Sequence, residues 1–119
     1  MAKETGAASI PATKVNGTAV YNPTGDRLGE IDDVMIEKRS GHVVFAVMSF
    51  GGLLGIGEKF HPLPWEVLKY DTNKDGYVVN LDKDALKKAP SYSRDEIGSD
   101  LAWRSKVSSY YSATPYWER

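Results

Sequence analysis

The chain has 119 residues and no cysteine, and 15 Lys and Arg residues against 16 Asp and Glu residues give a net charge of −1. This length is typical of a single domain. The lack of cysteine excludes disulfides, thiolate-bound metal centres and thiol catalysis. The balanced charge gives no overall attraction to nucleic acid or to an anionic membrane.

The N-terminus predicts no targeting segment. Residues 1–14 lack the apolar stretch of a signal peptide. The longest strictly apolar run, residues 43–48, is far shorter than the roughly 20 residues of a transmembrane helix. We therefore expect a cytoplasmic protein without a membrane span. Because residues 1–14 are small, polar and interrupted by proline, they also predict a flexible arm.

The next segment has the pattern of β-strands. A β-branched and aromatic run at residues 18–21 ends in an Asn-Pro-Thr-Gly-Asp turn. Residues 28–38 are long for a strand, and their apolar alternation changes phase near Asp32 and Asp33. One extra residue there would restore a continuous inner face, so we predict a β-bulge. A bulge bends its strand, as a small barrel requires.

The strongest strand, residues 42–50, follows a Lys-Arg-Ser-Gly hairpin turn and is apolar on both faces. A surface antiparallel strand alternates instead. A helix, the tail or another subunit must therefore cover its second face. In the glycine-rich segment that follows, the aliphatic residues Leu53, Leu54 and Ile56 predict a contact surface, because no polar side chain stands between them.

Two further strands are predicted at residues 67–70 and 77–81, after an FHPLPW segment whose prolines exclude a helix interior. The character then becomes helical. Residues 82–89 fit one or two turns before a proline, and Ser93 begins a Ser-x-x-Glu capping box that predicts a helix start. Residues 100–111 fit another helix with one apolar side.

The C-terminal region is rich in aromatic residues. Of the 13 aromatic residues in the chain, 6 lie after residue 90. Disordered tails are poor in such residues, so we expect this tail to dock on protein. The residues expected to be substantially buried, and to form an interaction surface together with the aliphatic loop, are Trp103, Tyr110, Tyr111, Tyr116 and Trp117.

Residues 15–81 resemble a PRC-barrel domain. The resemblance rests on glycine-containing and proline-containing segments in the order of that family. These are GTAVYN at 17–22, LGEIDD at 28–33, AVMSFGG at 46–52, GIGEK at 55–59, PLPW at 62–65, LKYD at 68–71 and GY at 76–77. The family is named after the cytoplasmic barrel of the photosynthetic reaction-centre H subunit, and it includes the C-terminal barrel of a ribosome-maturation factor.

The resemblance implies a mainly β chain with a small, strongly bent antiparallel β-barrel. It divides the sequence into an arm at residues 1–14, the barrel at 15–81 and a helical, aromatic-rich extension at 82–119. The transmembrane helix of H subunits and the N-terminal barrel of the maturation factor have no counterpart here, so the chain is similar to the stand-alone bacterial type. The resemblance also implies an assembly or interaction role without shared catalytic residues.

One acidic segment matches the ligand spacing of an EF-hand loop. Its oxygen-bearing residues are Asp71, Asn73, Asp75 and Asp82, and a glycine stands at the sixth position. An EF-hand needs a helix on each side, whereas prolines precede this loop and a strand pattern follows it. Asp, Asn and Gly are also typical of a β-turn. We therefore predict a turn, with these four residues as weak candidates for calcium.

No pattern predicts catalysis or a bound cofactor. The carboxylates around the bulge are interpreted as surface charge. Their spacing does not place two of them face to face, as a paired-carboxylate site requires. His42 and His61 have no third residue at metal-ligand spacing. The glycine-rich segment lacks the order of a phosphate-binding loop. We expect no catalytic residue, no resident metal and no cofactor.

The sequence thus predicts a non-enzymatic protein–protein interaction or assembly module. The alternative is an accessory factor in RNA or ribosome maturation, although the basic residues form pairs flanked by acids and not a stripe. A homodimer is also expected. It would cover the second face of residues 42–50, the aliphatic loop and the surplus aromatic surface of the tail. The tail could instead fold back on its own barrel.

Overall fold

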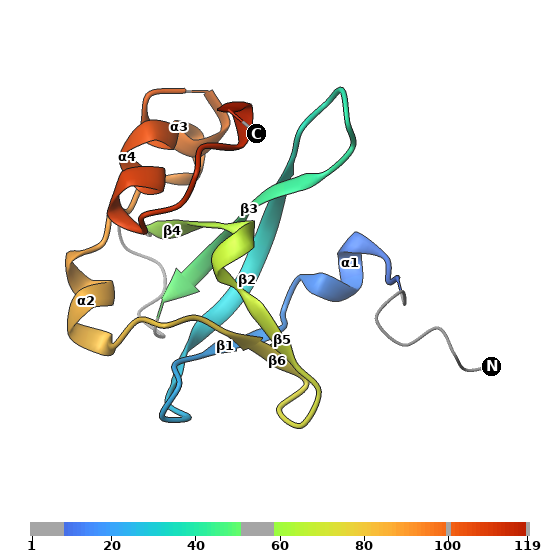
Figure 1. Cartoon of the computed structure of the whole chain (residues 1–119), viewed down its shortest axis with the longest axis vertical. Coiled ribbons are helices and arrows are strands. Elements are labelled where there is room, and N and C mark those ends of the chain that lie inside the picture. Colours follow the sequence, from blue (N-terminus) through green and yellow to red (C-terminus); the bar gives the residue numbers. More distant parts are fainter. Residues whose placement is uncertain (1–8, 51–58, 100, 119) are drawn as a thin grey trace.

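The computed structural model describes residues 9–50, 59–99 and 101–118. The strands are β1 (Ala19–Tyr21), β2 (Arg27–Ile36), β3 (Val43–Phe50), β4 (Phe60–Pro64), β5 (Lys69–Asp71) and β6 (Gly76–Val78). The helices are α1 (Ala12–Val15), α2 (Lys83–Lys88), α3 (Arg94–Ser99) and α4 (Trp103–Tyr110), with the 3₁₀ turns η2 (Trp65–Val67) and η3 (Tyr116–Glu118). The predicted mainly β chain with a helical extension is confirmed (Figure 1).

All six strands belong to one sheet, in the order β4-β3-β2-β1-β6-β5. The prediction of a wholly antiparallel sheet is wrong, because β1 and β6 pair in parallel. The reason lies in the connection. The chain leaves β1, builds β2 to β5, and returns through a β5–β6 hairpin, which brings β6 alongside β1 in the same direction.

The sheet is not closed into a barrel by strand pairing within the described residues, since β4 and β5 are its two edges. Pro62 and Pro64 explain why β4 is an edge, because proline has no N–H to donate to a further strand. A single bridge between Phe60 and Tyr92 covers the start of its outer side. The predicted closed barrel is thus replaced by a bent open sheet.

The bend comes from β2. Its register with β3 shifts between Ile31 and Asp33, which confirms the predicted bulge. At Gly29 the two backbones come so close that a Cβ atom would lie 2.0 Å from the carbonyl oxygen of Ser49. The β2–β3 hairpin ends at Gly41, whose φ of +78° is the left-handed conformation that glycine adopts without strain.

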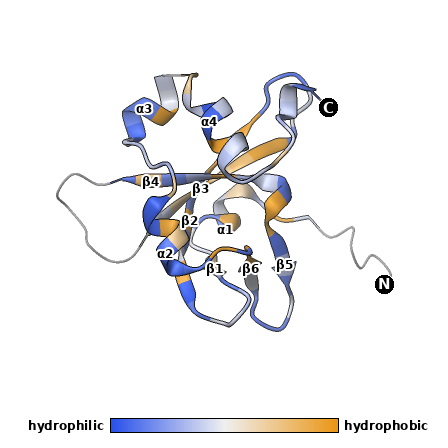
Figure 2. Cartoon of the chain, turned by 60° about the vertical axis from the view of Figure 1, so that its left-hand side comes forward, coloured by the Kyte–Doolittle hydropathy of each residue, from blue (hydrophilic) through white to orange (hydrophobic). Residues whose placement is uncertain are grey.

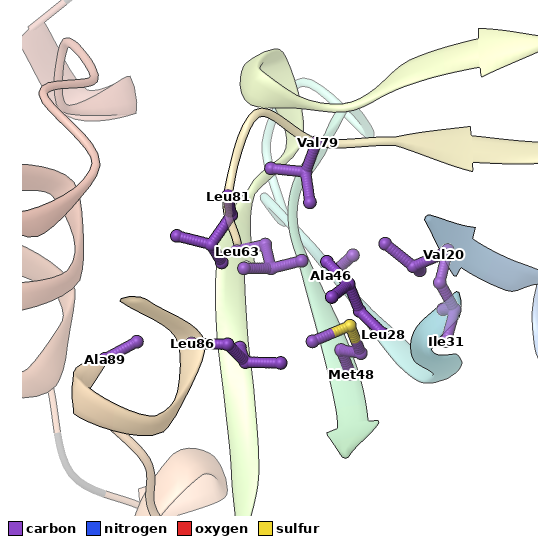
Figure 3. Close-up of a cluster of buried hydrophobic side chains, with 10 residues drawn as sticks. All are labelled: Val20, Leu28, Ile31, Ala46, Met48, Leu63, Val79, Leu81, Leu86 and Ala89. Atoms are coloured by element: carbon purple, nitrogen blue, oxygen red, sulfur yellow. The ribbon is translucent and has the colours of Figure 1, made fainter. Parts of the chain in front are cut away.

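The inner core lies on the concave side of the sheet. Ala46 and Met48 of β3 and Leu63 of β4 are fully buried there, and Leu86 of α2 closes it from the side (Figure 3). Its buried members are Val20, Leu28, Ile31, Ala46, Met48, Leu63, Val79, Leu81, Leu86 and Ala89. Helix α2 starts at Asp82, whose side chain accepts the N–H of Ala85 at 2.7 Å.

An outer core lies on the opposite face of β3. Phe45 and Val47 pack there against α3 and α4 of the same chain, whose helices stand beside β3 and β4 in Figures 1 and 2. The predicted cover over the second face of β3 is thus the tail of the chain itself. The buried members of this core are Val44, Phe45, Val47, Phe60, Ile97, Trp103 and Val107.

Of the other local predictions, the capping box is confirmed and two segments have different bounds. Ser93 and Glu96 form the predicted capping box, with Ser93 N–H donating to Glu96 Oε1 at 2.8 Å and Glu96 N–H donating to Ser93 Oγ at 3.2 Å. The strand expected at residues 77–81 is shorter, because β6 ends at Val78. Helix α1 begins at Ala12, so the end of the segment 1–14, expected to be a flexible arm, is helical. Residues 1–8 of that segment lie outside the described residues.

Candidate interaction surface

The predicted burial of the tail aromatics holds for part of the set. Trp103 is 2% exposed. Its ring meets Phe45 edge to face at 4.8 Å, and its indole N–H donates to the carbonyl of Ile97 at 3.2 Å. Tyr111 and Tyr116 are half-buried at the edge of the outer core. These three residues hold the tail on the sheet, so their surface is already used within the chain.

For the other two aromatics the predicted burial is wrong. Tyr110 is 39% exposed and Trp117 is 45% exposed. Tyr110 is the last residue of α4, and its hydroxyl donates to the carbonyl of Ala85 in α2 at 2.7 Å. The Trp117 ring stands edge to face with the neighbouring Tyr116 ring, at a centroid distance of 5.1 Å. Both are available for contact with a partner.

Tyr111 joins the two cores, since it packs against both. Its hydroxyl is buried without a hydrogen-bond partner among the described residues. Burial, with a smaller contribution from Tyr110, raises the pKa of this hydroxyl. The group therefore stays neutral at ordinary pH and acts in packing.

The aliphatic part of the predicted surface lies outside the described residues. Leu53, Leu54 and Ile56 belong to the segment 51–58. The prediction that they form a contact surface therefore stays a prediction.

The acidic segment forms a β-turn, as predicted. It joins β5 to β6, so strands and not helices flank it. Asp71 Oδ1 accepts the backbone N–H of Asn73 at 2.8 Å and that of Lys74 at 3.2 Å, and Asp75 adopts a φ of +51°. The fourth weak calcium candidate, Asp82, caps α2. No group of three metal-binding side chains occurs in the parts of the chain that the structure describes.

The carboxylates around the bulge have separate partners. Glu30 binds Arg27 at 3.0 Å, Asp32 binds Arg94 at 2.9 Å, and Asp33 accepts the backbone N–H of Val34 at 2.8 Å. Arg94 is the first residue of α3, and its guanidinium also lies 4.6 Å from the ring centre of Phe60. The ion pair with Arg94 therefore joins Asp32, at the bulge, to the tail. Of these contacts, the Asp32–Arg94 pair links β2 to α3, whereas the other two are local, and the three carboxylates do not form a paired-carboxylate site.

The two histidines lie in different surroundings. His61 is 5% exposed, and its Nδ1 lies 3.2 Å from the carbonyl oxygen of Pro90. Burial lowers the pKa of His61, and the contact with Pro90 opposes that shift. His42 is exposed beside the β2–β3 hairpin turn. The structure does not bring them together.

A row of aromatic rings that the sequence reasoning missed lies at the β5 edge of the sheet. Trp65 of η2, Tyr77 of β6 and Tyr70 of β5 form it, and we call it the aromatic row. Trp65 meets Tyr77 at 5.4 Å, and Tyr77 meets Tyr70 at 5.4 Å, both edge to face. Trp65 and Tyr77 are half-buried against the inner core, whereas Tyr70 is 52% exposed. The row thus runs from the core to solvent.

The solvent end of the aromatic row is acidic. The Tyr70 hydroxyl donates to Asp75 Oδ1. This hydrogen bond is the main cause that raises the pKa of Tyr70, and the charges of Asp75 and Asp71 add to it. Burial raises the pKa of Tyr77. The only cation–π contact in the described part of this hairpin lies elsewhere, because Lys74 Nζ is 5.3 Å from the ring centre of Tyr21.

A signal for this row was present in the sequence. The Asp71–Gly76 turn lies symmetrically between Tyr70 and Tyr77, so a hairpin places these two residues opposite each other on one face. The position of Trp65 could not be found this way, because the turn η2 that brings it to the row has no periodic pattern.

The comparisons with known proteins agree with the fold. The family model of the PRC-barrel domain matches residues 9–86. This range includes all six strands, α1 and most of α2. No curated protein matches the chain. In the described residues, no helix is long and apolar enough to cross a membrane.

Proposed function

The chain belongs to the PRC-barrel domain family, and we propose that it is a non-enzymatic protein–protein interaction or assembly module with a cytoplasmic location. The observation that supports this proposal most is the aromatic row. Tyrosine and tryptophan are enriched where proteins bind one another, because they offer large apolar area with a polar end. Tyr70 is the exposed member, so it is the first residue to test.

The test is affinity capture of partners from the source cell with three versions of the chain. The three versions are wild type, Tyr70→Ala and Ile36→Ala, and we expect all three to fold because both side chains are exposed. Ile36→Ala is the matched control, because it removes an equally exposed apolar side chain from β2, which β1 and β6 separate from β5. We expect a partner that wild type and Ile36→Ala retain and Tyr70→Ala loses. A partner set that is equal for all three chains would overturn the assignment of the row.

The alternative function is that of an accessory factor in RNA or ribosome maturation. Aromatic side chains can stack on bases. The acidic end formed by Asp71 and Asp75 opposes such a role, since nucleic-acid surfaces need cations. Binding to RNA with a steep loss of affinity in salt, and a weaker affinity in Tyr70→Ala, would favour this alternative.

Self-association is a further part of the proposal. One reason for expecting a homodimer no longer applies, because α3 and α4 cover the outer face of β3 within the chain. Tyr110 and Trp117 still leave exposed aromatic surface on the tail. Sedimentation at micromolar concentration tests the dimer. A single species near 13.1 kDa would exclude it.

A further inference from the structure

The aromatic row has the shape of a preformed binding surface. Trp65 and Tyr77 pack against the inner core, and the Tyr70 ring is held by its contact with Tyr77 and by its hydrogen bond to Asp75. Each ring stands edge to face with the next, so neighbouring rings form apolar walls at an angle to one another. A ligand would therefore meet rings that are already ordered, which lowers the entropy loss of binding.

The polar groups of the row select the ligand further. Trp65 is half-buried, and its indole N–H is a hydrogen-bond donor only. A ligand that fits must bring apolar surface together with free carbonyl acceptors. A polyproline II segment does so, because its backbone makes no internal hydrogen bonds and proline carries no N–H. Aromatic-lined grooves are a known way to bind such segments.

The charges next to the row add a second requirement. Asp75, which accepts the Tyr70 hydroxyl, creates negative potential at the Tyr70 end. Lys69 and Asp71 both neighbour Tyr70 in β5, so they share the opposite face of the strand, and Lys74 turns towards Tyr21. A basic residue of a ligand would therefore find the Asp75 carboxylate beside the last ring.

We propose that the aromatic row binds a proline-rich segment of a partner protein in the polyproline II conformation, with a basic residue of that segment beside Asp75. This proposal rests on the proposed function, since it names the chemistry of the partner at the same surface. Prolines lie against Trp65, Tyr77 and Tyr70. A ligand carbonyl accepts the Trp65 indole N–H.

The experiment is a titration of the full chain followed by NMR of the tryptophan indole N–H signals. The probes are a peptide of about ten prolines that carries one arginine, the same peptide with alanines for prolines, and the same peptide with glutamate for arginine. We expect the Trp65 indole signal to move in a saturable way with the first peptide. Trp103 serves as the internal control, because it is buried in the outer core and its signal should not move.

Variants make the result specific to the row. Tyr70→Ala should weaken binding at least about tenfold, as loss of an exposed aromatic anchor does. Tyr70→Phe, which keeps the ring but loses the hydrogen bond to Asp75, should bind more tightly than Tyr70→Ala. Ile36→Ala, which removes an exposed side chain of β2, should bind within about twofold of wild type. The glutamate peptide should bind more weakly than the arginine peptide because of the acidic end.

Two results would overturn the proposal. One is an equal Trp65 shift with the alanine peptide, and the other is no Trp65 shift with any peptide. If a Tyr70-dependent partner is nevertheless captured from the cell, the interaction function stands and only the partner chemistry is wrong. A Trp65 shift with a single-stranded RNA and with none of the peptides would contradict both proposals.

Discussion

The two faces of β3 are packed in different ways. On the inner face, Ala46 and Met48 meet side chains from the other strands and from α2, all within or close to the range that matches the family. On the outer face, Phe45 and Val47 meet Trp103 and Val107 from helices beyond that range. One strand thus supports a core that belongs to the domain and a second core that depends on the tail.

This difference explains the uninterrupted apolar run of β3. An antiparallel strand with solvent on one side alternates, whereas a strand buried on both sides does not. Here α3 and α4 of the same chain cover the outer face of β3. The apolar run of β3 is therefore explained by the tail and does not require a second subunit. The inner core should therefore survive loss of the tail, and the outer core should not survive loss of its aromatic anchor.

The largest effect is expected for Gly29→Val, because it damages the sheet that both cores share. The new Cβ would lie 2.0 Å from the backbone oxygen of Ser49, so the two strands would have to separate. We expect destabilisation beyond about 4 kcal/mol and a chain that does not fold cooperatively. Circular dichroism during urea titration measures this.

The matched control for that change is Gly98→Ala in α3. No atom lies within 4 Å of the position that the new methyl group would take, and alanine favours a helix. We expect the tail to gain up to about 1 kcal/mol of stability. A folded Gly29→Val protein with a normal urea midpoint would contradict the close approach of β2 and β3.

Trp103→Ala should separate the two cores. The tryptophan is 2% exposed and contacts Phe45, so its loss should cost about 3–5 kcal/mol in the outer core. Hydrogen exchange should show loss of protection for α3 and α4 while β1, β2 and β6 keep theirs. Uniform loss of protection over the whole chain would mean that both cores unfold as one unit.

Ser93→Ala should have a smaller effect on the same region. It removes the hydroxyl that accepts the Glu96 N–H, which is one half of the capping box. Loss of such a cap costs about 1 kcal/mol, and here it falls on α3. Ser109→Ala is the control, because Ser109 is exposed near the end of α4 and caps no helix start. Equal urea midpoints for the two variants would contradict the role of the capping box.

The sequence predicted those features that depend on local chemistry. The bulge at Asp32 followed from a phase change, and the start of α3 followed from the spacing of Ser93 and Glu96. Features that depend on distant contacts were missed or wrong. The parallel pairing of β1 with β6 and the arrival of Trp65 beside Tyr77 depend on how the chain crosses the sheet, and no local pattern encodes that path.

For the candidate site the same division applies. The tail aromatics were predicted as one buried set, yet only one side of a short helix can face the sheet. Trp103, Val107 and Tyr110 share that side by their spacing, but Tyr110 is the last residue of α4 and stays exposed, with its hydroxyl bound to Ala85 of α2. The exposed aromatic surface of the domain therefore includes Tyr70, which no helical pattern could indicate.

The smallest effect on stability at neutral pH is expected from His61 of β4, which pairs with Met48 of β3. Burial lowers its pKa below the ordinary value of 6.5, so the unfolded chain binds a proton at this position more readily than the folded chain does. The contribution of His61 to stability is therefore complete above about pH 6.5 and decreases as the pH falls from there through the lowered pKa. At pH 7 and above, the group has almost no influence on the pH dependence of stability.

His61→Asn tests this, because an amide can still donate to the carbonyl of Pro90 but does not titrate. We expect the variant to lose part of the decrease in urea midpoint between about pH 7 and pH 5.5 that wild type shows. His42→Asn, at an exposed histidine, should retain the wild-type decrease. Equal pH profiles for wild type and His61→Asn would show that protonation of His61 does not oppose folding. The inner core would then have to admit a charged imidazole between β4 and the segment that follows α2.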